Sequence, residues 1–311
     1  KTCFAKNLKD IINDDAVKKM ERENVHNLSA TQTTGLFQFP YKFYQGKTVE
    51  GIVVGGNIRC FLKLAGTEYF PDVTDKILFS ADAFGSFGAM SGNIFADEID
   101  WDKDFKDEAR RYYVNIVGKY GIPVQTLLKK ASALDIEMIC PLHGPILKDN
   151  LGYYIDKYQT WSSYQSEDEG VLVASASIHG NTKEVALKVV DLLKEKGVKV
   201  AFTDLTRDDM AEAVEDAFRY SKMILAGATY DGGVFVPMED FLHRLQHKGY
   251  QNKKVGLIEN GSWAPLANKV MKDMLTPMKN ITICENTVTI KSTYKDENQE
   301  AINQLVEEIC H

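Results

Sequence analysis

The amino-acid sequence predicts an α/β protein whose C-terminal part is a doubly wound, five-stranded parallel sheet. Residues 171–310 alternate five short apolar runs with five helix-patterned segments, which is typical of a parallel sheet covered by helices on both faces. The first apolar run leads into a small, hydroxyl-rich turn at the start of a helix. The polar, acidic stretch SYQSEDEG (163–170) precedes this region and is interpreted as a linker.

Each element follows from its periodicity and its flanking turn residues. In the C-terminal part, strands are expected at 171–174, 199–204, 222–226, 254–259 and 281–288. Helices are expected between and after them at 182–195, 208–219, 236–247, 264–275 and 296–310. Before the linker, the pattern predicts helices at 2–13, 15–23, 101–120, 123–133 and 151–162, and strands at 76–85 and 136–140. Residues 31–70 indicate short strands and turns.

Length and composition limit the class of protein. The 311 residues correspond to about two domains, which we place at 1–165 and 166–311. A net charge of −7 without a concentrated basic run argues against a nucleic-acid surface. No apolar stretch approaches the ~20 residues that span a bilayer, and no signal peptide is visible. The first residue is Lys1 rather than Met, so a processed chain or a piece of a longer one is expected.

Five cysteines are scattered along the chain without a CxxC pair. This spacing is typical of a reducing compartment and argues against a disulfide framework or a zinc site. Cys60, Cys140 and Cys284 are interpreted as small buried hydrophobic residues. A cytoplasmic protein is therefore expected.

The turn after the first apolar run has the features of an anion site. Free N–H groups at a helix start and the helix dipole favour a negative charge. Ser177 and Thr182 add hydroxyl donors, and Gly180 permits a close approach of the backbone. Because the turn contains neither Lys nor Arg, it would hold a phosphate by neutral hydrogen bonds. An ordinary polar turn remains the alternative. The turn comprises Ser177, Ile178, His179, Gly180, Asn181 and Thr182.

Two later loops follow the third and fourth expected strands and should meet this turn, because ligands bind outside the carboxyl ends of parallel strands. Each places an aromatic residue beside glycine and small polar residues. A flat heteroaromatic ring could stack on Tyr230 and Trp263, which would contribute about 1 kcal/mol per stacked pair. The two loops contain Ala228, Thr229, Tyr230, Asp231 and Gly232, and Asn260, Gly261, Ser262 and Trp263.

With these loops, residues 170–311 resemble a flavodoxin domain. SIHGNT is similar to the flavodoxin loop that binds the phosphate of flavin mononucleotide (FMN), and loops 229–232 and 260–263 are similar to those that hold its isoalloxazine ring. The whole chain resembles the flavodiiron proteins, or A-type flavoproteins, in which a metallo-β-lactamase-like αββα domain precedes the flavodoxin domain. The resemblance covers 75–311 well and the preceding residues poorly, which implies a partial first domain. The stretches that carry the resemblance are LFSADAFGSFGA, ARRYYVNIVGKYG, ICPLHGP and IENGSWAP.

The resemblance also implies a metal site. In that family, an HxExDH motif, a His before Trp-Pro, a bridging Asp and a His in a PLHGP-like loop hold two irons. Asp82 matches the bridging Asp, and His143 matches the last His. In ERENVH (21–26), Glu23 and His26 match two positions of the first motif.

The sequence departs from the family pattern at other ligand positions. Glu21 and Val25 stand where a His and an Asp are expected, and LKLAGTEYFP (62–71) contains no His. A two-iron site with these ligands would be under-coordinated and weakly held. His243 and His247 are i, i+4 neighbours, but without a third ligand nearby we interpret them as a solvated helix face.

The resemblance implies an FMN-dependent oxidoreductase that passes electrons to a non-haem diiron site, which reduces O2 to water or NO to N2O. It also implies a head-to-tail homodimer and a separate rubredoxin-like or reductase electron donor. The missing ligands leave open an alternative, an FMN electron-transfer protein with a metal-poor scaffold. A hydrolase is less favoured still. No catalytic side chain is assigned from the sequence.

Overall fold

The computed structural model describes residues 76–90 and 92–311. The expected elements before residue 76, Cys60, and the proposed ligands Glu23 and His26 lie outside the described residues. Within the described part, no helix is both long and apolar enough to cross a membrane.

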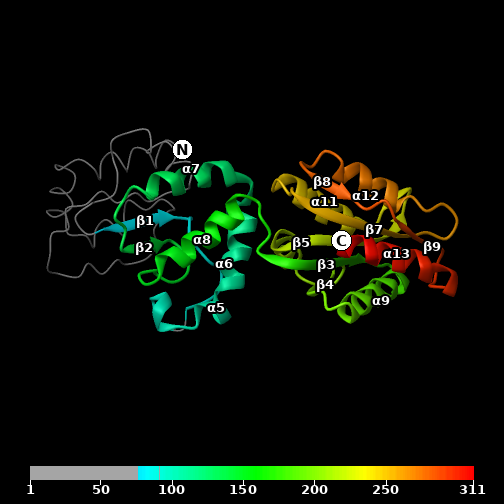
Figure 1. Ribbon diagram of the computed structural model, residues 1–311, viewed down its shortest axis with the longest axis horizontal. Coiled ribbons are helices and arrows are strands. Elements are labelled where there is room, and N and C mark those ends of the chain that lie inside the picture. Colours follow the sequence, from blue (N-terminus) through cyan, green and yellow to red (C-terminus); the bar gives the residue numbers. More distant parts are fainter. Residues whose placement is uncertain (1–75, 91) are drawn as a thin grey trace, which may run out of the picture. The chain divides into compact units, whose positions relative to one another are not determined.

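The predicted parallel sheet is present in the C-terminal part (Figure 1). Its strand order is β4-β3-β5-β7-β8, so the first strand lies between the second and the third. A short strand β6 pairs antiparallel with β5, and β9 pairs with β7. The bounds are β3 Asp168–Ala176, β4 Val200–Asp204, β5 Tyr220–Tyr230, β6 Gly233–Val234, β7 Lys253–Asn260, β8 Ile281–Ile283 and β9 Val288–Ile290.

The prediction of one continuous last strand at 281–288 is wrong. β8 and β9 are separate, and both pair in parallel with β7. Between them, the N–H groups of Glu285 and Asn286 donate to the Glu308 carboxylate. These groups are therefore not available for the ladder with β7, and the strand is interrupted.

Helices cover both faces of this sheet (Figure 1). Val171 and Val173 of β3 lie in one buried cluster with side chains of α9 and α13. Leu172 and Ala174 point to the opposite face and lie in a second cluster with α10 and α11, as the two-residue period of a strand requires. The helices are α9 Asn181–Glu195, α10 Met210–Arg219, α11 Val236–His247, α12 Ala267–Leu275 and α13 Gln299–Cys310, the last preceded by the 3-10 turn η4 Asp296–Asn298.

The part before residue 163 contributes two described strands, β1 (Ile77–Ala81) and β2 (Met138–Pro141), which pair in parallel. The prediction of one helix over 101–120 is wrong. Phe105 leaves the helical conformation with φ −130°, and a π-helical turn follows at Tyr113–Val117. The elements are η1 Ala96–Glu98, α5 Trp101–Asp104, α6 Lys106–Tyr112, η2 Tyr113–Val117, η3 Gly118–Tyr120, α7 Gly121–Ala131 and α8 Leu151–Ser162.

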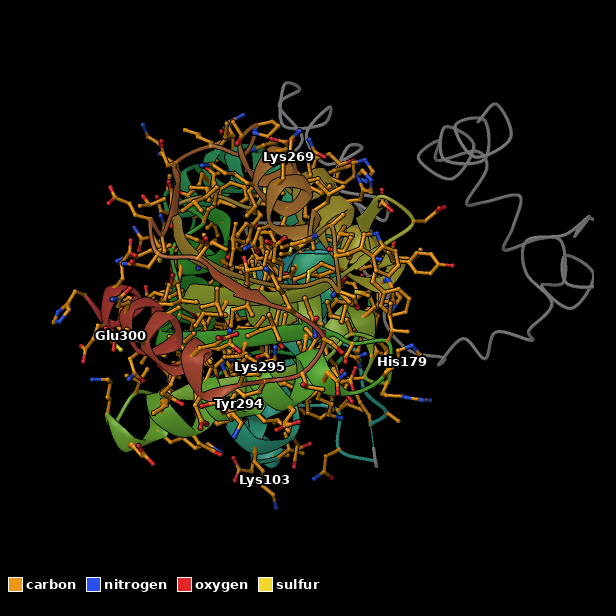
Figure 2. The ribbon with its side chains drawn as sticks, turned by 90° about the vertical axis from the view of Figure 1, so that its right-hand side faces the viewer. Lys103, His179, Lys269, Tyr294, Lys295 and Glu300 are labelled. Carbon is orange, nitrogen blue, oxygen red and sulfur yellow. The ribbon has the colours of Figure 1, made fainter. Side chains whose placement is uncertain are left out.

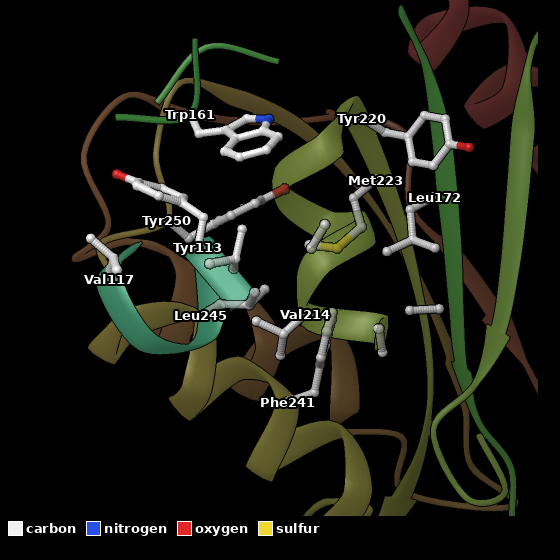
Figure 3. Close-up of a cluster of buried hydrophobic side chains, with 14 of the residues drawn as sticks. Tyr113, Val117, Trp161, Leu172, Val214, Tyr220, Met223, Phe241, Leu245 and Tyr250 are labelled. Atoms are coloured by element: carbon white, nitrogen blue, oxygen red, sulfur yellow. The ribbon is translucent and has the colours of Figure 1, made fainter. Parts of the chain in front are cut away.

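A hydrophobic cluster joins η2 and α8 to the helices beside the sheet (Figure 3). Tyr113 and Trp161 belong to the same buried cluster as Val214, Leu245 and Tyr250. Burial of side chains of this size removes a large apolar area from water and stabilises the packed arrangement. The described residues between 76 and 162 therefore share a core with the C-terminal part.

The interpretation of 163–170 as a linker is also wrong in part, because β3 already begins at Asp168. Glu167 is almost fully buried and accepts a hydrogen bond from Arg110 Nε at 2.5 Å. Arg110, from α6, is 1% exposed and also pairs with Glu215 of α10. Lys157 Nζ lies 2.7 Å from the other carboxylate oxygen of Glu167. An acidic residue that suggested a linker is instead a buried ionic contact.

Candidate functional site

The turn between β3 and α9 has the open geometry that an anion site needs. Gly180 stands at the N-cap of α9 with φ 95°, a left-handed conformation that favours glycine. A Cβ at this position would meet nothing within 4 Å. Its N–H donates to Ser177 Oγ at 3.0 Å, and the Ser177 hydroxyl keeps its own proton for a ligand. The first N–H groups of α9 have no partner within the helix.

Side chains of this turn differ in exposure. Ile178, His179 and Gly180 are exposed, whereas Thr182 is buried. The nearest cation, Lys183, lies 2.9 Å from Asp204 Oδ2, so its charge is compensated within the protein. Hydrogen bonds from neutral groups therefore remain the principal means by which this turn could bind a phosphate.

The second loop is a tight hairpin between β5 and β6. Asp231 and Gly232 have φ 48° and 71°, as the two central residues of a type I′ turn require. Tyr230 precedes the turn; it is half exposed, and its ring packs edge-on against Phe235 with 5.7 Å between centroids. Thr229 Oγ1 accepts hydrogen bonds from the N–H groups at the start of α12. The second loop is thereby joined to the third.

The third loop is held by hydrogen bonds between the Asn260 side chain and the backbone after β9, and it leaves the ring of Trp263 exposed to solvent. Asn260 exchanges two hydrogen bonds with Ser292, at 2.8 and 3.1 Å. Gly261 has no room for a side chain, since a Cβ there would lie 2.8 Å from Pro265 Cα. Trp263 is 92% exposed, which is unusual for so large an apolar surface. The contact with Ser292 was not expected from the sequence, because no periodic signal links a loop to a residue so far along the chain.

The three loops follow β3, β5 and β7, which are adjacent in the sheet and parallel. They therefore end at the same edge. This edge presents uncompensated N–H groups and hydroxyls beside β3, and the rings of Tyr230 and Trp263 beside β5 and β7. Such a combination can hold a ligand with a phosphate and a planar ring.

The structure also brings together the two proposed metal ligands that it describes. Asp82 follows β1, His143 follows β2, and His143 Nε2 lies 3.8 Å from Asp82 Oδ1. The Tyr112 hydroxyl donates to the same Asp82 oxygen at 3.4 Å. Burial and the Asp82 charge raise the pKa of Tyr112, so the phenol keeps its proton. Ser86 N donates to the His143 carbonyl and fixes the loop.

The described residues do not complete a metal site around this pair. Among residues 76–90 and 92–311, no group of three His, Cys, Asp or Glu side chains is placed to hold a metal. His243 and His247 are exposed, with ring centroids 6.4 Å apart, in keeping with a solvated helix face. Cys284 is buried, as expected, but Cys140 is only half buried.

Known protein sequences match most of this chain. A flavorubredoxin named as an anaerobic nitric oxide reductase, from Aliivibrio salmonicida, is 27% identical over 234 residues, which is 72% of this chain and 46% of that protein. An uncharacterized protein of Methanocaldococcus jannaschii is 25% identical over 224 residues, 72% of this chain and 56% of that protein. The chain thus spans about half the length of the curated relatives it matches. The family model for the LD-carboxypeptidase C-terminal domain matches residues 50–87, too short a stretch to assign a family.

Solved structures agree with the predicted fold class. The flavodiiron protein of Giardia intestinalis has a TM-score of 0.70 at 25% identity, covering 75% of this chain and 58% of that chain. A flavodiiron protein of Thermotoga maritima has a TM-score of 0.67 at 26% identity, covering 77% and 60%. The rubredoxin:oxygen oxidoreductase of Desulfovibrio gigas, at 21% identity, has a TM-score of 0.70 and supports the fold alone. The prediction of an α/β fold with a flavodoxin-like sheet, preceded by a metallo-β-lactamase-like part, is confirmed.

Proposed function

The chain is a homologue of the flavodiiron proteins, and we propose on this premise that it is an FMN-dependent oxidoreductase that reduces O2 or NO at a two-iron centre. The observation that carries the proposal is the sheet edge, where an anion-binding turn and two aromatic loops follow adjacent parallel strands. Similarity to a flavorubredoxin that is an anaerobic nitric oxide reductase supports a reductase more than a simple electron carrier. We place the flavodoxin-like part at 166–311.

The residues at this edge fit FMN. The turn 177–182 would bind the phosphate through its N–H groups and hydroxyls, since the space above Gly180 is open. Tyr230 and Trp263 would contact the planar ring, and the fixed backbone around Gly261 and Asn260 would hold its polar edge. When bound, the flavin supplies electrons one at a time. The protein contributes position, polarity and exclusion of water.

The metal centre rests on fewer groups. Asp82 and His143 are adjacent and are the oxygen and nitrogen donors that iron accepts. Two such donors cannot hold two irons, so the described residues alone do not fit the centre. We propose Glu23 and His26 as further ligands. We derive no reaction step through the metals.

The remaining parts of the proposal concern partners. We propose a head-to-tail homodimer, in which the exposed Trp263 edge faces a second copy, and a rubredoxin-like or reductase donor. We also propose a cytoplasmic location, which the absence of a CxxC pair supports.

The test combines cofactor analysis with reduction of substrate. The purified chain is supplied with FMN and iron, its flavin and iron contents are measured, and the reduced protein is mixed anaerobically with NO or aerobically with O2. We expect about one flavin per chain, bound iron, and rapid reoxidation by one of the two gases. His143→Ala should remove the iron and the fast reoxidation but keep the flavin, and His247→Ala is the matched control. Flavin without iron would indicate the electron carrier, and failure to take up flavin would overturn the proposal.

A further inference from the structure

A cavity of about 460 Å³ lies between α12 and the interrupted last strand, apart from the three loops. Its walls come from β7, α12 and the segment that separates β8 from β9. Figure 2 labels Lys269, on α12, and His179, in the turn before α9, at separate places on the surface. A volume of this size is within the range of small-molecule sites.

The interruption of the strand creates this cavity. β8 pairs with β7 up to Val255, and pairing resumes only at Ile258 with β9. The intervening Gly256 and Leu257 have no register partner in either short strand. Because the Glu308 carboxylate holds the N–H groups of Glu285 and Asn286, this segment is kept away from β7. The apolar floor of the cavity is formed by Leu257 and Ile283.

The polar wall carries uncompensated positive charge. Lys269 and Lys272 are i, i+3 neighbours and share one helix face, and both line the cavity. Neither ammonium group has an ion-pair partner within the described part of the chain. Glu285 is the one acidic residue of the lining. Cys284, also in the lining, adds no charge, because burial raises the pKa of its thiol to about 11.

Asn268 also lines the cavity, and its side chain is held by the surrounding backbone. Its backbone N–H donates to Glu259 Oε2 at 2.9 Å, and its Nδ2 donates to the Val288 carbonyl. Its Oδ1 is inaccessible and has no hydrogen-bond partner in the described protein. An unsatisfied buried acceptor costs roughly 1–3 kcal/mol.

We propose that this cavity is a second ligand site, which binds a small phosphate monoester. The phosphate lies against Lys269 and Lys272, since two adjacent ammonium groups match a dianion better than a monoanion. The carbon skeleton of the ligand covers Leu257 and Ile283, beside Asn268. The site is independent of the proposed flavin chemistry.

The test uses the FMN-saturated full chain titrated with glucose 6-phosphate, with glucose as the uncharged control. Backbone amide shifts are followed by NMR. We expect saturable shifts at Asn268, Lys269, Glu285 and Thr287, and none with glucose. Lys269→Gln and Lys272→Gln should each weaken binding about tenfold. Lys279→Gln, an exposed lysine outside the cavity, should stay within about twofold.

The possible results separate this proposal from the preceding one. Absence of saturable shifts up to about 10 mM glucose 6-phosphate, or equal loss in Lys279→Gln, would overturn the second site. If the chain took up no flavin, shifts at 177–182 would report the sugar phosphate in the empty turn, while shifts at 268–287 would still report the cavity.

Discussion

The sheet edge after β3, β5 and β7 and the pair Asp82–His143 after β1 and β2 are two sites built from different kinds of groups. The sheet edge relies on backbone N–H groups, hydroxyls and aromatic faces within three short loops. The pair relies on two side chains, 3.8 Å apart, from strands separated by about sixty residues. Both follow the carboxyl ends of parallel strands, but the described residues supply three candidate binding loops at the sheet edge and only two candidate ligands at the pair.

The difference shows which kind of site tolerates sequence change. A backbone N–H is present in every residue except proline, so an anion-binding turn requires only the correct fold and a few small residues. A metal centre loses affinity with each missing side-chain ligand. The two regions nevertheless share a core and the Arg110 ion pairs. Four experiments test how far the comparison holds.

The largest expected effect is the loss of Arg110. Arg110→Ala leaves Glu215 buried without its cation and Glu167 with Lys157 alone, which should lower the free energy of unfolding by about 3–5 kcal/mol. Denaturant unfolding measures it, with Arg111→Ala as the control. Arg111 pairs with Glu108 on its own helix and is more exposed, so about 1 kcal/mol is expected. Equal losses in the two variants would show that the buried pair does not stabilise the shared core.

The second effect is the loss of stability in acid. Burial opposes ionisation of Glu167, but hydrogen bonds from Arg110, Lys157 and Trp161 lower its pKa to about 2. The folded pKa lies below the unfolded value of 4.5. The ionised Glu167 therefore contributes to the free energy of unfolding above pH 4.5, and this contribution is lost as the pH falls toward 2. It amounts to about 3 kcal/mol.

Glu167→Gln is the comparison for this pH dependence. Burial raises the pKa of the neighbouring Glu215 to about 7, which gives the opposite slope between pH 4.5 and 7 in both proteins. The difference between the two unfolding curves isolates Glu167, and it should shrink below pH 4.5. A difference that is constant from pH 6 to pH 3 would contradict the ionised, buried Glu167.

The third effect concerns the flavin edge alone. Trp263→Ala should weaken FMN retention about tenfold, since stacking and burial of the ring contribute about 1 kcal/mol or more. Fluorescence titration of the flavin-free protein measures it. Ile122, which is 79% exposed on α7, provides the control Ile122→Ala. Unchanged FMN affinity in Trp263→Ala would exclude the stacking contact.

The smallest effect is the loss of the contact between the second and third loops. Thr229→Val removes the hydroxyl that accepts from the first N–H groups of α12, which should cost about 1 kcal/mol. It should also loosen both flavin loops and raise the FMN dissociation rate. Thr293→Val, at an exposed position, is the control. A normal dissociation rate would show that the two loops hold their positions independently.

The regular part of the fold could be predicted because its signals are local. Val171–Ala174 is apolar on both faces, as a buried parallel strand must be, and α11 has the predicted bounds. The alternation of strands and helices also placed the polar turn after the first strand and the two aromatic loops after the third and fourth strands. The prediction that the three loops lie at one edge of the sheet needed only the rule for the ends of parallel strands.

The errors arose where a distant partner decided the local structure. Glu167 lies in an acidic stretch, but it is buried and forms ion pairs with Arg110 and Lys157. Residues 281–288 have strand propensity throughout, but Glu308 on α13 draws the middle of the segment out of the ladder. Phe105, whose side chain is buried, leaves the helical conformation within a helix-patterned segment.

By itself, the sequence determined the α/β class, the order of the elements and the residues of the three loops, because apolar periodicity and turn chemistry act over a few residues. Only the tertiary structure decided that Asp82 meets His143, that a supposed linker is a buried ion pair, and that a cavity opens beside Asn268. Those features depend on side chains far apart in the chain. Tertiary packing decides whether such groups come into contact and whether they are buried, and a local sequence pattern does not contain this information.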